Sequence, residues 1–533
     1  MTESVVRLRA GGNTRPGRCS GATSGRTSGR WWFVPLVATG CVLPLYAVWA
    51  AVLATGGGDL AAQFAWAGFA SRHPASAYNL FWYGGTHTAN YSLLTPYLMA
   101  WCGARTVSVL AGLGGTWVLS RLVVRTGVRW PLAPALLGAL ALWCNVASGR
   151  TTFAVGVAIG LLAVVWLERR VAAPVCAALA TMASPVAGLF LVVLAGALLL
   201  DRQWRRALGF ALPPFLVVAA TTLAFPFQGE QPMAAGKLWM PLVACAALGI
   251  AARHRLVRYS ALVYGAGVVL TYLIPSPIGT NVERLVGLVG PVVLLVAVLA
   301  ERTRVRCAVL VAALCLNCYW LADKTADDLR VSTTVPAWAA DTQGVVTALD
   351  GLRADRTRVE VVPARNHREA TLLAPHVNMA RGWNRQLDVE RGRLFYDGSL
   401  TAATYRAWLD RFAVGYVVLH DGRPDGPAEA EAALVRSRPH WLQPVWHDAH
   451  WRIYRVRGAA PLVEAPASVV SGGDAKLVVH VPRPGTVTVR IAYSPWLRAS
   501  GGGSVHRHGQ WTGLTVRRPG DYRLGSGYRA LVG

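Results

Sequence analysis

The sequence predicts a polytopic α-helical membrane protein with about eleven transmembrane helices and a soluble C-terminal region. Eleven apolar segments lie within residues 31–322, and residues 323–533 contain no further segment of this kind. The composition agrees, because 53% of the residues are hydrophobic and only 15% are charged, whereas an average soluble domain has about 25% charged residues. The lipid bilayer is therefore the first partner that the sequence predicts.

The N-terminal segment is expected to remain on the cytoplasmic side. Residues 1–30 are rich in Arg, Gly and Ser, a composition typical of a disordered basic tail. The apolar run at 31–54 is too long for the hydrophobic core of a signal peptide, and it has no persuasive cleavage site. We therefore interpret this run as the first transmembrane helix, which leads outward from a cytoplasmic N-terminus.

Arginine clusters set the expected orientation of the remaining segments. These segments are residues 107–123, 131–147, 151–167, 171–184, 186–200, 207–225, 239–252, 259–274, 285–300 and 307–322. Arginines follow the second, fourth, sixth, eighth and tenth segments, and cytoplasmic loops carry an excess of Arg and Lys. We expect a multi-pass protein of the cell membrane whose C-terminal region and loop 55–106 lie outside the cytoplasm.

The region 171–200 decides this orientation. Arginines flank it on both sides, so it must cross the membrane twice or not at all. Proline disfavours helix at the residue before it, and the Ser184-Pro185 pair lies in the middle of the region. We expect a short helical hairpin here, whereas a single long helix would reverse the orientation of everything downstream.

The formal charge of +26 also comes largely from the arginines that orient the apolar segments. Only three lysines occur, and many of the arginines stand at the ends of apolar segments. No basic-aromatic motif typical of nucleic-acid recognition is present, so we expect no nucleic-acid partner. No cysteine follows Cys318, which excludes a disulfide or a cysteine metal site in the C-terminal region.

Loop 55–106 contains the first candidate site residues. Asp59 follows three glycines and precedes a helical pattern. Trp82 is a candidate substrate-binding residue and belongs to a group of aromatic residues that suit a membrane interface. Asp59 would cap the helix, act as a general base on a sugar hydroxyl, or help to bind a divalent metal ion. His87 is a candidate substrate-binding residue, or else a hydrogen-bonded loop histidine. We expect two surface helices in this loop with a Gly-rich turn between them.

A second candidate lies in loop 275–284. Glu283 and Arg284 stand at the start of an apolar segment. They would form an interface anchor, or Arg284 would hold a lipid phosphate, because guanidinium groups and helix N-termini both suit phosphate.

The C-terminal region is predicted to contain two domains. Residues 323–457 combine helical patterns at 341–352 and 401–412 with four short strands, which indicates an extracytoplasmic α/β domain. Residues 458–533 contain Gly- and Pro-separated strand patterns at 476–481, 486–493 and 511–516, typical of a β-sandwich.

An irregular stretch in the α/β domain completes the candidate site. Residues 367–398 include Trp383, Arg385 and Asp388 in a segment with little periodicity. Aromatic faces stack on sugar rings and Arg/Asp pairs bind hydroxyls, so these three residues are candidates for binding a glycan. The alternative is a buried, salt-bridged loop.

The layout resembles the GT-C class of membrane glycosyltransferases, which have many helices and an acidic residue soon after the first one, where Asp59 stands here. Many of those enzymes have a paired acidic motif, whereas Asp59 stands alone. The phrases SPVAGLF (184–190), PSPIGTN (275–281) and ARGWNRQLD (380–388) also resemble actinobacterial integral membrane proteins of unassigned activity. The GT-C resemblance implies a polyprenyl-phosphate sugar donor, an inverting transfer and a cell-envelope glycan acceptor.

Three functions are compatible with the sequence. The first is a glycosyltransferase in which Asp59 is the base and Arg284 holds the donor phosphate. The second is a transporter or flippase, although transporters usually show internal repeats with paired broken helices. The third is a non-catalytic scaffold whose outer domain binds envelope glycan.

Overall fold

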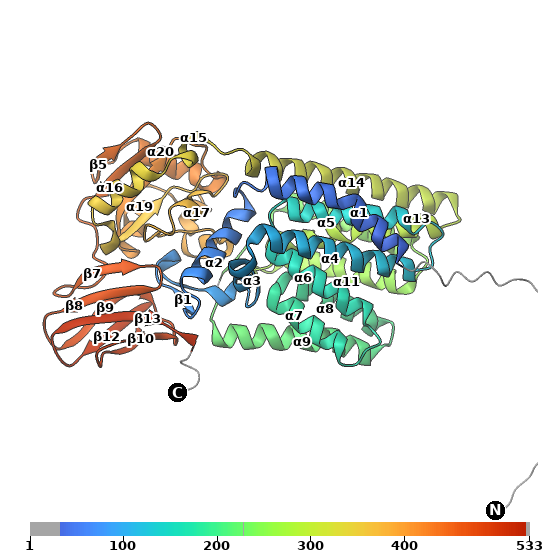
Figure 1. Ribbon diagram of the computed structural model, residues 1–533, viewed down its shortest axis with the longest axis horizontal. Helices are drawn as coiled ribbons and strands as arrows, with labels where there is room; N and C mark the ends of the chain where they lie inside the picture. Colours follow the sequence, from blue (N-terminus) through green and yellow to red (C-terminus); the bar gives the residue numbers. More distant parts are fainter. Residues whose placement is uncertain (1–31, 228, 529–533) are drawn as a thin grey trace, which may run out of the picture.

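The structure, a computed structural model, describes residues 32–227 and 229–528. A bundle of long helices occupies one end of the molecule, and the strands of the C-terminal region gather at the other end (Figure 1). The segment that follows the first long helix lies between these two parts (Figure 1). The expected basic tail, 1–30, falls outside the described residues.

Helices occupy all of the apolar segments expected in the membrane region. They are α1 (Phe33–Val48), α4 (Ala104–Arg125), α5 (Leu132–Ala147), α6 (Thr151–Val165), α7 (Ala172–Ala183), α8 (Pro185–Leu200), α9 (Trp204–Ala224), α10 (Trp239–Ala251), α11 (Arg255–Leu273), α12 (Arg284–Leu288), α13 (Gly290–Ala300) and α14 (Arg304–Thr333). Among the described residues, 6 helical stretches are long and apolar enough to cross a membrane, and the other apolar helices are shorter. The long helices make this a multi-pass membrane protein with the bilayer as a partner, while eleven crossings stay a prediction.

The expected break at Ser184-Pro185 is confirmed. Helix α7 ends at Ala183, Ser184 has an extended backbone, and Pro185 is the first residue of α8. Buried residues from the start of α7 and the end of α8, such as Ala173 and Leu198, belong to one hydrophobic cluster. The two helices therefore pack side by side as an antiparallel hairpin.

Helix α14 continues beyond the expected end at residue 322. It extends to Thr333, and its last turns are polar. This extension carries Lys324, Asp327 and Asp328 to the boundary between the bundle and the C-terminal region, where they line a cavity.

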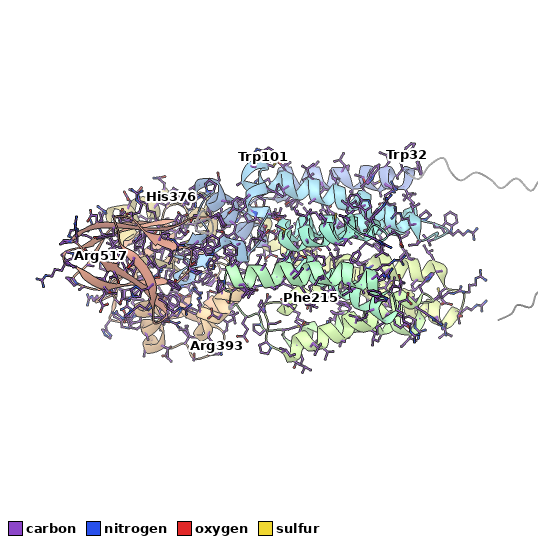
Figure 2. All side chains as sticks on the ribbon, turned by 90° about the horizontal axis from the view of Figure 1, so that it is seen from below. Trp32, Trp101, Phe215, His376, Arg393 and Arg517 are labelled. Atoms are coloured by element: carbon purple, nitrogen blue, oxygen red, sulfur yellow. The ribbon has the colours of Figure 1, made fainter. Side chains whose placement is uncertain are left out.

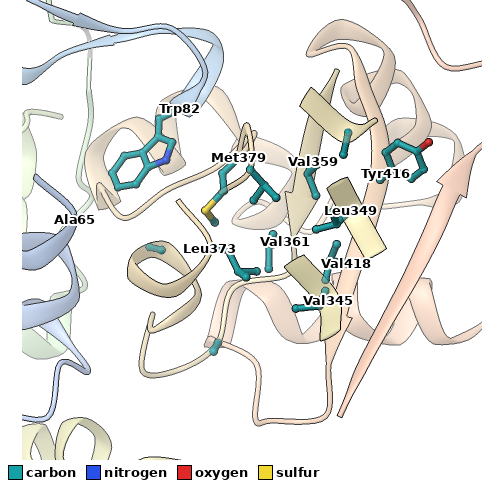
Figure 3. Close-up of a cluster of buried hydrophobic side chains, with 14 of the residues drawn as sticks. Ala65, Trp82, Val345, Leu349, Val359, Val361, Leu373, Met379, Tyr416 and Val418 are labelled. Atoms are coloured by element: carbon teal, nitrogen blue, oxygen red, sulfur yellow. The ribbon is translucent and has the colours of Figure 1, made fainter. Parts of the chain in front are cut away.

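Loop 55–106 contains the two expected helices, α2 (Asp59–Arg72) and α3 (Thr95–Cys102), joined through the short strands β1 (Tyr78–Asn79) and β2 (Thr86–His87). The expectation that its aromatic residues lie at the membrane interface is wrong for Trp82, which is buried in the core of the α/β domain together with Trp66. Figure 3 shows Trp82 beside Met379 and the domain's strands. The C-terminal region folds over the loop and removes these rings from lipid and water.

The α/β domain has one sheet with strand order β3-β4-β6-β5. Its strands are β3 (Arg358–Val361), β4 (Val414–His420), β5 (Leu442–His447) and β6 (Trp451–Val456), and its helices include α16 (Gln343–Gly351), α17 (Glu369–Leu372), α18 (Arg385–Arg391), α19 (Ala402–Arg411) and α20 (Glu429–Arg436). Strands β3 and β4 are parallel, and the other pairs are antiparallel. The irregular stretch 367–398 leaves this sheet and reaches the bundle.

The end of the chain forms two antiparallel sheets that pack against each other around one apolar cluster. One sheet has the order β10-β13-β8-β7 and the other β11-β12-β9. The strands are β7 (Ser468–Gly473), β8 (Lys476–Val481), β9 (Gly485–Ala492), β10 (Leu497–Ala499), β11 (Ser504–His508), β12 (Trp511–Val516) and β13 (Gly520–Ser526). Loop 55–106 contributes Tyr78, Leu80 and Phe81 to this core.

Candidate functional site

A cavity of about 920 Å³ lies between the helix bundle and the C-terminal region. Helices α2, α8, α9 and α14 supply much of its wall, and segments of the α/β domain complete it. Asp59, Arg284, Trp383 and Arg385, which are far apart in the sequence, all line it. The structure thus brings together four of the seven predicted site residues.

The glycines before Asp59 allow its loop to pass close to the end of α14. Gly58 has a φ of +65°, in the region that favours glycine. A Cβ on Gly57 would lie 2.7 Å from the carbonyl oxygen of Ser332. The glycine run is therefore needed to place Asp59 where it stands, at the first residue of α2.

Two arginines engage the Asp59 carboxylate. Arg150 Nε donates a hydrogen bond to Asp59 Oδ2 at 3.1 Å, and Arg284 Nη2 lies 3.9 Å from the same oxygen. Burial alone would raise the pKa of Asp59, but the two guanidinium groups outweigh burial and hold this pKa below its ordinary value. Asp59 is therefore ionised at neutral pH.

The helix-cap interpretation of Asp59 does not match this geometry. Gly58 holds the N-cap position of α2, and no side chain makes a capping hydrogen bond there. The Asp59 side chain is 34% exposed and directs its carboxylate to the arginines. This arrangement leaves the carboxylate accessible to a molecule in the cavity.

Arg150 also ties Asp59 to helix α14. Its Nη2 donates to Asp328 Oδ2 at 2.9 Å, so one guanidinium group bridges two carboxylates. The sequence prediction did not include either residue. A signal existed for Arg150, because it stands in the short turn between two apolar segments on the side expected to be outside, where arginine is not needed for orientation.

Arg284 has unused hydrogen-bonding capacity. Its guanidinium lies 5.4 Å from the centre of the Phe153 ring, and its ion pair with Asp59 at 3.9 Å is longer than a hydrogen bond. Among the described residues, no hydrogen-bond acceptor for Arg284 is present. An anion that enters the cavity would find these N–H groups available.

The interpretation of Glu283 and Arg284 as a local interface anchor also does not match. Glu283 is buried and accepts a hydrogen bond from Lys324 Nζ at 2.7 Å. The two neighbours in sequence therefore have different partners, and both lie inside the protein. Lys324 belongs to the polar end of α14, which the sequence interpretation had assigned to the start of the soluble region.

Trp383 and Arg385 form part of the cavity wall on the α/β side. The Trp383 ring is stacked on His367 with the ring centres 3.5 Å apart, and the Arg385 guanidinium lies over Trp383 at 4.9 Å. His367 therefore covers one face of the Trp383 ring. The Trp383 indole N–H donates to Gly58 O at 3.2 Å.

Arg385 is paired within the protein as well. It donates to Asp425 Oδ2 at 2.7 Å and to the Tyr396 hydroxyl at 2.9 Å. Asp425 and His367 line the cavity but were not predicted. Their contribution comes from loops whose polar residues are common in any soluble domain, so the sequence held no specific signal for them.

Three predicted site residues do not reach the cavity. Trp82 is 4% exposed and packs edge-on against Trp66, at 4.9 Å between ring centres. His87 is 5% exposed and shares a hydrogen bond of 2.8 Å with Ser494 Oγ of the β-sandwich. Both residues hold the loop against the C-terminal region. His87 is thus a hydrogen-bonded loop histidine, the alternative to a substrate-binding residue.

Asp388 is the third of these residues. It accepts a hydrogen bond from the Tyr396 hydroxyl and lies 3.8 Å from Arg381 Nη1. Arg381 is itself buried and pairs with Glu360 and Glu431. Here the alternative of a buried, salt-bridged loop describes the structure, because Arg381 lies among the carboxylates of Glu360, Glu431 and Asp388 inside the domain.

A divalent metal ion was the cofactor considered for Asp59. Within the part of the chain that the structure describes, no three His, Cys, Asp or Glu side chains come together as a set of ligands. The groups closest to the Asp59 carboxylate are cationic arginines instead.

Comparisons with known proteins give limited matches. Residues 464–507, within the β-sandwich, match a family model described as a domain of unknown function, DUF8823. No curated protein sequence matches the chain. The structure is similar to the arabinofuranosyltransferase AftD from Mycobacteria, with 15% identity and a TM-score of 0.42, over 84% of this chain and 41% of that chain. The chain thus spans less than half of the AftD chain.

Proposed function

We propose that the protein is a membrane glycosyltransferase that takes a sugar from a polyprenyl phosphate on the outer face of the cytoplasmic membrane and transfers it to a cell-envelope glycan. The observation that carries this proposal is a single cavity that combines an ionised carboxylate, an arginine with free N–H groups and an apolar wall. A lipid-linked sugar phosphate needs all three.

The apolar wall supports a lipid substrate. Val186, Leu189 and Val192 of α8 line the cavity, as do Phe215 and other apolar residues of α9. Phe215 is 61% exposed and lies at the surface of the bundle (Figure 2). The apolar wall therefore continues to the surface that faces lipid, along which a prenyl chain could enter.

The polar end supports the transfer chemistry. In an inverting transfer the acceptor hydroxyl attacks the anomeric carbon, the bond to the phosphate oxygen breaks, and Asp59 takes the hydroxyl proton. Arg150 weakens the basicity of Asp59 but fixes its direction. The hydroxyl becomes more acidic as its bond to carbon forms, so a carboxylate of low pKa is sufficient. Arg284 would stabilise the charge that develops on the leaving phosphate.

The first experiment compares wild type, a deletion strain, Asp59→Asn and the control Asp350→Asn, a change on the exposed face of α16. Envelope glycans and lipid-linked sugars are measured by mass spectrometry with protein levels verified. We expect the deletion and Asp59→Asn to lack one glycosidic linkage or to accumulate the donor, with turnover reduced about 10²–10⁴-fold by loss of a general base. The control should match wild type.

The outcomes separate the candidate functions. A normal glycan profile in a well-expressed Asp59→Asn strain would exclude Asp59 as the base. A defect in the deletion strain alone would favour the transporter or scaffold, and transport into proteoliposomes would then separate these two.

A second experiment tests Arg284. The full chain in nanodiscs is titrated with a synthetic polyprenyl phosphate, and Arg284→Gln is compared with Arg302→Gln, an exposed arginine before α14. Loss of a charge-assisted contact should weaken phosphate binding by about 10- to 100-fold in Arg284→Gln only. Equal phosphate binding by both variants would show that Arg284 does not hold the phosphate.

A further inference from the structure

One part of the cavity wall carries a group of uncharged polar side chains. It lies where loop 226–238, loop 275–284 and the start of α18 meet. We name it the amide wall, and its members are Gln231, Thr280, Asn281, Asn384 and Gln386, all of which line the cavity. None of the five bears a charge, whereas the Asp59 end of the cavity is dominated by ion pairs.

Hydrogen bonds fix four of these side chains relative to one another, and the fifth, Asn384, accepts from Leu387 N at the start of α18. Gln231 Nε2 donates to Thr280 Oγ1 at 2.6 Å, and Gln231 Oε1 accepts from Asn281 Nδ2 at 2.9 Å and from Gln386 Nε2 at 3.2 Å. Gln231 is therefore the centre of the network. Among the described residues, none donates to Asn281 Oδ1 or Gln386 Oε1, so these acceptors remain for a ligand.

The backbone holds the three segments together behind the side chains. Glu230 N donates to Gln386 O at 3.0 Å, and Gln231 N donates to Ser276 O at 3.0 Å. Such a wall is preorganised, because ligand binding would not have to order the loops.

The chemistry of the wall selects its ligand. Amides and hydroxyls both donate and accept hydrogen bonds, as sugar hydroxyls do. The five members of the amide wall offer no cation to offset the loss of water from a carboxylate or phosphate. The neighbouring Arg385 is already paired with Asp425 at 2.7 Å. We propose that the amide wall is a subsite for an uncharged, hydroxyl-rich sugar ring. This inference rests on the proposed function and names the class of sugar that the cavity accepts.

The test measures binding of free oligosaccharides to the full chain in nanodiscs. The probes are short neutral oligosaccharides of pentoses and hexoses, and matched oligosaccharides that contain uronic acids. The double variant Thr280→Val, Gln386→Leu removes hydrogen-bonding groups at nearly constant volume, and Gln343→Leu on the exposed face of α16 is the control. Thermal unfolding verifies that each variant is folded.

We expect at least one neutral probe to bind more tightly than its uronic counterpart, and the double variant to bind it about tenfold more weakly. The control should bind as wild type does. Equal binding of neutral and uronic probes, or binding unaffected by the folded double variant, would overturn the proposal.

Two further measurements show whether the bound ring belongs to the donor or to the acceptor. They also test the sugar subsite separately from the proposed glycosyltransferase activity. A polyprenyl-phosphoryl hexose that displaces the oligosaccharide assigns the wall to the donor sugar, and simultaneous binding assigns it to the acceptor. Polyprenyl phosphate alone should still bind to the double variant. If phosphate binding is independent of Arg284 while neutral sugars still require the amide wall, the subsite stands and the proposed function fails.

Discussion

At the scale of single residues, Arg150 explains how a single carboxylate, that of Asp59, can stay ionised in the candidate site. A lone buried carboxylate would tend to take up a proton, because burial disfavours charge. Arg150 prevents this at Asp59 and is itself held by Asp328 at 2.9 Å. The ion pair leaves part of the Asp59 side chain exposed to the cavity, so the carboxylate is both ionised and accessible.

His87 yields a prediction on pH dependence. Burial, together with the nearby Arg391, lowers the pKa of His87 from 6.5 to about 4. The unfolded chain then binds a proton more readily than the folded chain, so this histidine destabilises the fold as pH falls from about 6.5 to 4. We expect wild type to lose about 2–3 kcal/mol of stability from this residue between pH 7.5 and 4.5.

The measurement is thermal or denaturant unfolding of wild type and His87→Gln at both pH values. The glutamine can keep a hydrogen bond to Ser494, the partner of His87, but it cannot titrate. A smaller acid-induced loss in His87→Gln is the expected result. Identical losses in the two proteins would show that His87 does not respond to pH in this range.

At the scale of elements, Arg368 joins three segments at the end of the bundle. Its Nη1 donates to Thr55 O at 2.6 Å, and its Nη2 donates to Ser332 O at 2.7 Å and to Thr334 O at 3.3 Å. Arg368 lies just before α17, so the α/β domain clamps the end of α14 to the loop that leads to Asp59. The position of Asp59 therefore depends on a domain more than 300 residues later in the chain.

This clamp predicts a local loss of order in Arg368→Lys. A lysine ammonium cannot match the planar fork of arginine, so several carbonyl groups would lose their donor. We expect a loss of about 2–4 kcal/mol in stability, given the energy of charge-assisted hydrogen bonds. Hydrogen exchange at residues 55–62 should become faster, while the exposed control Arg356→Lys should leave exchange there unchanged. Unaltered exchange at 55–62 in Arg368→Lys would contradict the clamp.

The same long-range packing explains which elements the sequence could predict. Strand β4 (Val414–His420) and the helices of the bundle follow from local apolar patterns. Strand β11 (Ser504–His508) is mostly exposed and polar, and it is ordered by pairing with β12. Local pattern alone does not identify such a strand.

The candidate site shows the same limit. Asp59 was identified by its place after three glycines and before a helical pattern, and Arg284 by its place at the start of an apolar segment in a loop expected to be outside. Trp82 and His87 were misplaced because their residue types suit a membrane interface or a binding loop as well as a core. Their place in a buried core depends on the packing of the C-terminal region over this loop, which the local sequence does not reveal.

At the scale of the whole molecule, the arginine clusters gather at the end of the bundle opposite the C-terminal region. Arg125 Nη1 donates to Val165 O at 2.5 Å, Arg206 pairs with Glu168, and Arg253 Nη1 donates to Ala300 O at 3.3 Å. These contacts join basic residues to the ends of helices that are not adjacent in the sequence. Figure 1 shows that α14 leads from this end toward the C-terminal region.

This arrangement predicts the topology. Because basic loops stay in the cytoplasm, the cavity and the C-terminal region should lie outside. Single cysteines are introduced at Arg517, on the sandwich (Figure 2), and at Arg170, in the basic turn after α6, in a cysteine-free background. A membrane-impermeant maleimide should label Arg517→Cys in intact spheroplasts and Arg170→Cys only after permeabilisation. The reverse pattern would place Asp59 in the cytoplasm, where an outer-face sugar transfer could not occur.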